Sequence, residues 1–274
     1  ATSPTLVATL NSGTVYYFRI IDFTGTGTSF TLTLTAPTPT ISAPANNAVL
    51  SGVLTATYGT ASATPRTVTV TGTALTNNIV TTAANTNFEV SSNGTTWGNT
   101  ATFTPNAAGA VNGTLSVRFS ATAPANAVAG TYNNVNVATL ASEGVSGTIT
   151  VKTTTSNSNT VSKKSLTLTV NPRTITYGEI PANVTAAANN SCVLSGFVNG
   201  ETSAGETGTA TYTTTYVGNE NAGAVNETVS YSSGLTAANY TFTNASGAIT
   251  IIRANTTSVT VTNGSPYTYN TNPQ

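Results

Sequence analysis

The chain has 274 residues, of which only 6% are charged, and its eight basic and eight acidic side chains give a formal net charge of zero. A chain without basic clusters lacks the positive surface that binds nucleic acid or anionic lipid. No apolar run reaches the roughly 18 residues that a membrane-spanning helix needs, so we expect no nucleic-acid partner and no direct membrane insertion.

The two ends of the chain have the pattern of incomplete β modules. Residues 5–35 predict only the last strands of one sandwich, and residues 255–274 predict only the opening strands of another. A two-stranded ribbon is marginal in water, so its apolar face needs a cover. Strands from a longer chain, or from a neighbouring subunit that donates a strand, would provide it. The predicted strand-exchange positions are Phe30, Leu32, Leu34, Val259, Val261, Tyr267 and Tyr269.

The residues between these ends predict strands rather than helices. Thr alternates there with Val, Ile, Leu and aromatic residues, a pattern typical of β-structure. Prolines at 37, 39 and 172 follow strand-like runs and mark the expected domain junctions. Length and spacing together predict about two or three all-β domains, as tandem sandwich modules in an elongated string. The predicted strands lie at 52–58, 66–73, 86–91, 100–104, 114–121, 131–140, 145–155 and 160–170.

Residues 145–170 predict one long hairpin that closes the central module. Both halves alternate strictly, and a polar Asn-Ser-Asn sequence at 157–159 lies midway between them. A flexible Thr- and Ser-rich linker at 153–164 is the alternative.

The composition offers little catalytic chemistry. The chain has no His, the commonest general base and metal ligand, and Asp22 is its only Asp. Glu201 and Glu206 are the nearest pair of carboxylates, but they flank a glycine and indicate a solvated loop. We therefore expect no enzyme, no cofactor and no metal site.

Three other side chains have a functional and a structural interpretation. Trp97 follows a turn. We expect its side chain to fill the core or cover the edge of a sheet rather than to stack on a carbohydrate. Lys163 and Lys164 could supply an amine for an intramolecular isopeptide bond, but paired lysines also protect the edge of a sheet, which we favour.

Four motifs between residues 173 and 253 resemble the MBG repeat, also called the YGX or YDG type. In order they are TYGE at 176–179, LSGFVNGET at 194–202, SGLTAANYT at 233–241 and GAITI at 247–251. Glu179 stands where this family usually has Asp. The resemblance implies a tandemly repeated domain of large bacterial surface and secreted proteins, with no known catalytic residues.

The flanking sequences resemble related modules. NFEVS at 87–91, GTTW at 94–97 and AGTY at 129–132 are similar to an immunoglobulin-like module of Bacteroidota proteins exported by the type IX system. LNSGTVYYFRI at 10–20 is similar to the end of a fibronectin type III domain. These resemblances divide the chain into a fibronectin-like end at 1–36, an immunoglobulin-like sandwich at 37–171, an MBG-type domain at 172–253 and the opening of a further repeat at 254–274.

The sequence thus predicts a stalk or fibre segment of an extracellular, cell-surface adhesin-like protein. Its partners would be neighbouring modules of the same chain or identical subunits in a homopolymer, with surface glycans as a further ligand class. Two alternatives stay open: a filament subunit joined by donor-strand complementation, and a carbohydrate-binding accessory region of a secreted enzyme.

Overall fold

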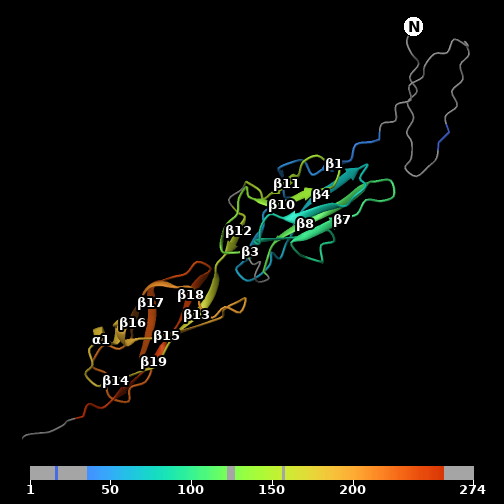
Figure 1. The fold of residues 1–274 in the computed structure, drawn as a ribbon. Helices are drawn as coiled ribbons and strands as arrows, with labels where there is room; N and C mark the ends of the chain where they lie inside the picture. Colours follow the sequence, from blue (N-terminus) through green and yellow to red (C-terminus); the bar gives the residue numbers. More distant parts are fainter. Residues whose placement is uncertain (1–15, 18–35, 122–126, 156–157, 256–274) are drawn as a thin grey trace, which may run out of the picture. The chain divides into compact units, whose positions relative to one another are not determined.

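Figure 1 shows the computed structural model of the chain, which describes residues 16–17, 36–121, 127–155 and 158–255. Strands dominate the described residues, and a short α-helix and a 3₁₀ turn accompany them. They form two compact units: the first runs to Lys164 and includes residues 198–201 and 238–240, and the second contains the rest. The predicted all-β class is confirmed. No described helix is long and apolar enough to cross a membrane.

Two sheets make up most of the first unit. One has four strands, the other five, and their neighbours are mostly antiparallel. In spatial order the four-stranded sheet contains β1 (Thr40–Ala43), β4 (Arg66–Thr73), β8 (Val111–Phe119) and β6 (Phe88–Ser91). The five-stranded sheet contains β2 (Ala48–Val49), β11 (Ile149–Lys152), β10 (Asn136–Ala141), β5 (Ile79–Ala83) and β7 (Thr100–Phe103).

These two sheets face each other across an apolar core. Val70 and Leu115 of the four-stranded sheet and Ile79 and Leu140 of the five-stranded sheet are all completely buried. The two sheets approach each other closely at Gly113 of β8. A Cβ atom added to this glycine would lie only 2.7 Å from the ring of Phe103 in β7. Because Thr alternates with aliphatic residues along the strands, the aliphatic side chains on one face of each sheet point into the core. The first unit therefore has the character of a sandwich.

A small third sheet completes the first unit. Its central strand β12 (Thr160–Ser162) pairs in parallel with β3 (Thr55–Thr57) and antiparallel with β9 (Gly130–Thr131). Asn159, just before β12, is fully buried, and its Oδ1 accepts a 2.9 Å hydrogen bond from the backbone N of Leu54. Its Nδ2 donates to Oγ1 of Thr154 at 2.7 Å. This amide fixes β12 beside β3.

The second unit also has two sheets. Its three-stranded sheet has the order β15 (Cys192–Ser195), β13 (Lys164–Val170) and β18 (Tyr240–Ala245). Its four-stranded sheet has the order β14 (Arg173–Thr176), β19 (Gly247–Ile252), β17 (Thr228–Thr236) and β16 (Thr207–Thr214). The helix α1 (Pro181–Thr185) and the 3₁₀ turn at Ala187–Asn189 lie between β14 and β15 in the chain.

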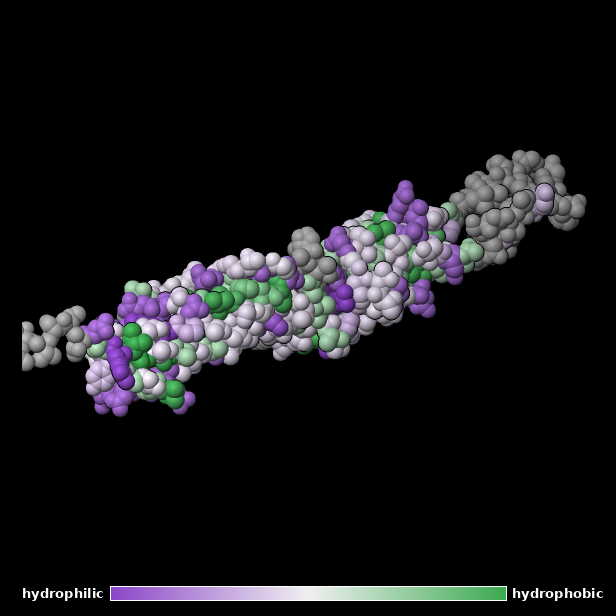
Figure 2. Space-filling view, turned by 90° about the horizontal axis from the view of Figure 1, so that it is seen from below, coloured by the Kyte–Doolittle hydropathy of each residue, from purple (hydrophilic) through white to green (hydrophobic). Residues whose placement is uncertain are grey.

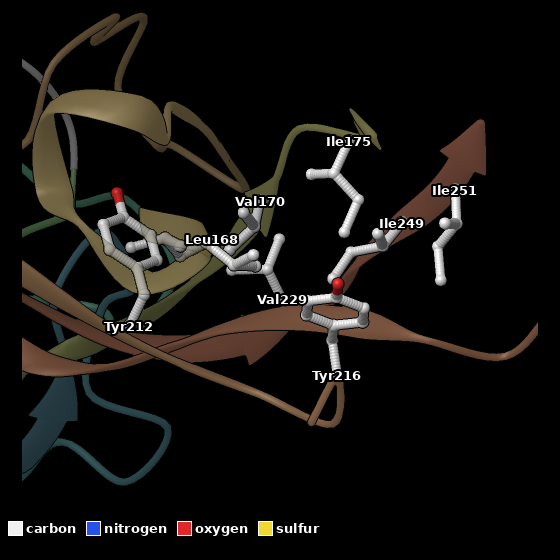
Figure 3. Packing of buried hydrophobic residues seen from close by; sticks show 9 residues of the cluster. Leu168, Val170, Ile175, Tyr212, Tyr216, Val229, Ile249 and Ile251 are labelled. Atoms are coloured by element: carbon white, nitrogen blue, oxygen red, sulfur yellow. The ribbon is translucent and has the colours of Figure 1, made fainter. Parts of the chain in front are cut away.

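Alternation also builds the core of the second unit. Along β13, Leu166, Leu168 and Val170 are completely buried, whereas the Thr residues between them are exposed. Figure 3 shows Leu168 and Val170 gathered with aliphatic residues of β14, β17 and β19 and with Tyr212 and Tyr216. The hydroxyl of Tyr216 donates to the backbone O of Glu179 at 2.8 Å, so the buried phenol keeps a partner.

The predicted hairpin at 145–170 is wrong. β11 pairs with β10 and β2 in the first unit, whereas β13 pairs with β15 in the second. The linker alternative at 153–164 is wrong for Thr160–Ser162, which form β12. The predicted strand at 66–73 coincides with β4, but β5 was not predicted. The four-part domain scheme stays a prediction.

The burial pattern of β13 yields a stability prediction. Leu168→Ala should lower the free energy of unfolding by about 2–5 kcal/mol, because it removes a fully buried side chain and leaves a cavity. Thr169→Ala, on the exposed face of the same strand, should cost less than about 1 kcal/mol. Chemical denaturation of both variants measures the difference, and equal losses would contradict the assigned faces.

Candidate functional site

The most distinctive polar site in the first unit joins Tyr58, Glu201 and Tyr240, which we call the tyrosine–carboxylate cluster. Tyr58 follows β3 directly, and its backbone N donates to the O of Ser162 at 2.8 Å, which extends the ladder between β3 and β12. Tyr240 is the first residue of β18. Both tyrosines are almost fully buried, whereas Glu201 is half-buried. The cluster therefore combines three parts of the chain that are distant in sequence.

Each oxygen of the Glu201 carboxylate accepts a hydrogen bond from a tyrosine hydroxyl. The hydroxyl of Tyr58 donates to Oε1 and the hydroxyl of Tyr240 donates to Oε2. The two rings meet edge to face, with centroids 5.3 Å apart and planes at 83°. This geometry satisfies two buried hydroxyl groups with one carboxylate and adds a favourable aromatic contact.

A tight turn presents Glu201 to the two tyrosines. The backbone N of Glu201 donates to the O of Val198 at 3.0 Å, and the central residues Asn199 and Gly200 have φ angles of 57° and 75°. Two positive φ angles define a type I′ turn, for which Asn-Gly is the preferred sequence. The VNGE sequence thus encodes the turn locally.

Close packing places this turn against the residue after Tyr58. Gly59 has a φ angle of 80°, and a Cβ atom on it would lie 2.3 Å from Cγ2 of Val198. A side chain there would force the turn away. Gly59 is therefore required both for its backbone conformation and for the approach of Val198.

Burial raises the pKa of Tyr240 to about 12, and the hydrogen bond to Glu201 adds to this rise. Ionisation of the phenol would put a second negative charge in a partly dehydrated site beside the carboxylate. Tyr240 thus stays a neutral donor throughout the physiological range. The chemistry of the cluster favours a fixed structural contact rather than proton transfer near neutral pH.

A second polar site surrounds Trp97 in the same unit. Nη2 of Arg118 lies 2.8 Å from Oε2 of Glu89, its cross-strand partner, and Oγ of Ser120 donates to Oε1 at 3.0 Å. The guanidinium lies over the Trp97 ring, 4.2 Å from its centroid. Trp97 is half-buried, and Arg118 covers one of its faces. The sequence favours a core or edge plug at this position over carbohydrate stacking, and both interpretations stay predictions.

The structure corrects the interpretation of Glu201. The sequence predicted a solvated loop around Glu201 and Glu206, but only Glu206 is exposed, while Glu201 binds two buried tyrosines. Nothing in the sequence indicated that Tyr58 and Tyr240 are the partners of Glu201. The Asn-Gly turn before Glu201 was the available sign that this residue has a fixed place.

The other predicted positions have mixed outcomes. Lys163 is exposed, and Lys164 opens β13, where its backbone N donates to the O of Asn239 at 2.9 Å. Among the described residues, no group of three or more His, Cys, Asp or Glu side chains could hold a metal ion. The seven predicted strand-exchange positions lie outside the described residues: Phe30, Leu32, Leu34, Val259, Val261, Tyr267 and Tyr269.

Removing the carboxylate tests the cluster. Glu201→Ala leaves two buried hydroxyl groups without their acceptor, so we expect the free energy of unfolding to fall by about 1–3 kcal/mol. Glu206→Ala, at an exposed position five residues later, should change it by less than about 0.5 kcal/mol. Chemical denaturation compares the two, and an equal effect would show that the contacts of Glu201 contribute nothing.

The raised pKa of Tyr240 predicts a loss of stability at alkaline pH. Below the ordinary tyrosine pKa of 10.0 the phenol is neutral in both states, and its stabilisation is fully present. As pH rises from there to about 12, the unfolded chain ionises this group and the folded chain does not, so stability falls.

Tyr240→Phe should flatten this part of the pH dependence. The measurement is the free energy of unfolding of this variant and of the unmodified protein over a series of alkaline pH values. Identical slopes for the two proteins would argue against a perturbed Tyr240.

Comparisons with known proteins leave the chain without an assigned family. No family model, no curated protein and no solved structure matches it. The MBG, immunoglobulin-like and fibronectin-like resemblances therefore stay predictions that rest on the motifs in the sequence.

Proposed function

We propose that this chain is a non-catalytic structural segment of an extracellular bacterial stalk or fibre, whose modules transmit tension along the polypeptide. The observation that carries the proposal is the parallel pairing of early and late strands in each unit. The resemblance of residues 173–253 to MBG repeats supports a cell-surface protein, of the kind that Bacteroidota export through the type IX system.

In the first unit, the late strand β12 pairs in parallel with the early strand β3. Thr55, Ala56 and Thr57 lie opposite Thr160, Val161 and Ser162 in this register. A second parallel pair, β2 with β11, lies in the five-stranded sheet. The early strands of this unit thus run in the same direction as the late strands beside them.

The second unit repeats this arrangement. Its early strand β14 pairs in parallel with its last strand β19, from Arg173 opposite Ile249 to Thr176 opposite Ile252. The backbone N of Tyr177 extends the ladder with a 2.8 Å hydrogen bond to the O of Ile252. Ile175 and Ile251 of the two strands are buried in the core, so apolar packing supports the ladder.

Parallel pairing determines how a chain under tension responds. A pull on the two ends moves an early strand toward the N-terminus and a late strand toward the C-terminus. Parallel neighbours are then sheared along their length, so their hydrogen bonds share the load. An antiparallel pair at the same places would be peeled apart one bond at a time. Both units therefore have strand pairs suited to resist extension.

The surface of the described residues also suits a passive structural element. Figure 2 shows a face that is mostly of intermediate hydropathy, with small hydrophilic and hydrophobic areas interspersed. Such a surface follows from the Thr-, Ser- and Asn-rich sequence. The hydroxyl and amide groups on the exposed strand faces can form hydrogen bonds with water.

Single-molecule force spectroscopy on the full chain, pulled from its two ends, tests the proposal. We expect two resolved unfolding peaks, one for each unit. Tyr177→Pro should lower the force for the second unit because it removes the hydrogen bond to Ile252. Tyr177→Ala is the matched control, since it removes the side chain but keeps the backbone N–H.

Equilibrium denaturation of the same variants separates mechanical from thermodynamic effects. One lost backbone bond should cost only about 0.5–1.5 kcal/mol in unfolding free energy. Extension of both units without a resolved peak, or equal forces for the Pro and Ala variants, would rule out the parallel ladder as a mechanical element.

A further inference from the structure

The turn that presents Glu201 contains an Asn-Gly sequence with reactive chemistry of its own. In Asn-Gly sequences the backbone nitrogen of Gly can attack the side-chain amide of Asn, because Gly has no side chain to hinder the approach. Nothing lies within 4 Å of the position that a Cβ atom on Gly200 would occupy. The glycine side of this pair is therefore open.

The side-chain amide of Asn199 is also free to react. Its Nδ2 atom is buried and has no hydrogen-bond partner among the described residues. A buried amide without a partner is costly, and no hydrogen bond from this nitrogen must break before the side chain can rotate. Both reacting groups of the Asn199–Gly200 pair are thus available.

Two other Asn-Gly pairs in the described residues are held more firmly. Oδ1 of Asn93 accepts hydrogen bonds from the backbone N atoms of Thr95 and Thr96, at 2.9 and 2.8 Å. It also bonds Oγ of Ser91 at 3.0 Å. The Asn93 side chain must lose several hydrogen bonds before it can react.

The third pair, Asn112–Gly113, lies inside a strand. Asn112 lies in the ladder between β8 and β4, opposite Thr71 and with a paired residue on either side, and a Cβ atom at Gly113 would clash with Phe103. The extended, paired backbone holds the Gly113 nitrogen in the sheet. The chain therefore contains one open Asn-Gly pair and two restrained controls among its described residues.

We propose that Asn199 is a site of spontaneous deamidation that modifies the tyrosine–carboxylate cluster as the protein ages. The backbone nitrogen of Gly200 loses its proton and forms a bond to Cγ of Asn199. The bond between Cγ and Nδ2 breaks, and Nδ2 leaves as ammonia, which takes up the proton. The product is a five-membered succinimide. Water then adds to either of its carbonyl groups and opens the ring to aspartate or isoaspartate, without any change of oxidation state.

Either product alters the position of Glu201. Aspartate adds a negative charge two residues before the carboxylate that binds Tyr58 and Tyr240. Isoaspartate also lengthens the main chain by one atom, which the type I′ turn and its 3.0 Å bond between Glu201 and Val198 do not accommodate. Modification should therefore weaken the hold of Glu201 on both tyrosines.

Mass spectrometry on the full chain tests the proposal. The protein is incubated in mildly alkaline water enriched in heavy oxygen, digested and mapped by peptide. We expect label and deamidation at Asn199 about tenfold faster than at Asn93 or Asn112, since those side chains must first lose hydrogen bonds or leave the sheet. A rate at Asn199 no higher than at Asn93 would overturn the proposal.

Two variants separate the reaction from its consequence. Gly200→Ala should slow deamidation at Asn199 and leave the rates at Asn93 and Asn112 unchanged. Asn199→Asp should reproduce the aspartate product, with a changed pH of Tyr240 ionisation in a spectrophotometric titration. An Asn199→Asp protein whose tyrosine titration equals that of unmodified protein would show that the cluster does not sense the modification.

Discussion

The second unit depends on the parallel pairing of β14 with β19. This pairing joins strands from the beginning and the end of the unit, and it aligns Ile175 with Ile251 so that both enter the core. Contacts this distant in sequence close a long loop, and the entropy that this costs has to be offset by other contacts within the unit. The stability of the ladder is therefore a property of the whole unit.

Amide and hydroxyl groups take over the roles that charges have in other proteins. Arg118 and Glu89 form an ion pair, and Ser120 and the Trp97 ring complete its surroundings. Many other specific contacts use a neutral group, as Asn159 does between β12 and its neighbours. Such contacts are little affected by salt, in contrast to surface ion pairs. A chain with this composition should keep its stability over a wide range of ionic strength.

Sequence reasoning gave the fold class and many strand positions because alternation reveals which residues face the core. It did not give strand partners. The hairpin at 145–170 failed for this reason: Thr148–Val151 and Ser165–Val170 alternate equally well, but the alternation does not specify the partner strand. Glu201 failed for a related reason, since its partner Tyr58 lies 143 residues away and a glycine-rich loop indicates exposure. Only the local part of that site, the Asn-Gly turn, could be predicted from the sequence.

The contact between Gly59 and Val198 also has an evolutionary consequence. The space that a side chain at position 59 would need is already filled by Val198, and the positive φ of Gly59 would strain a side chain there even if that space were open. A smaller residue at position 198 would therefore not make a larger residue at position 59 acceptable. Natural variants of this chain should keep glycine at position 59 whatever residue they have at position 198, and a segment exchanged between variants should fit only if it retains this glycine.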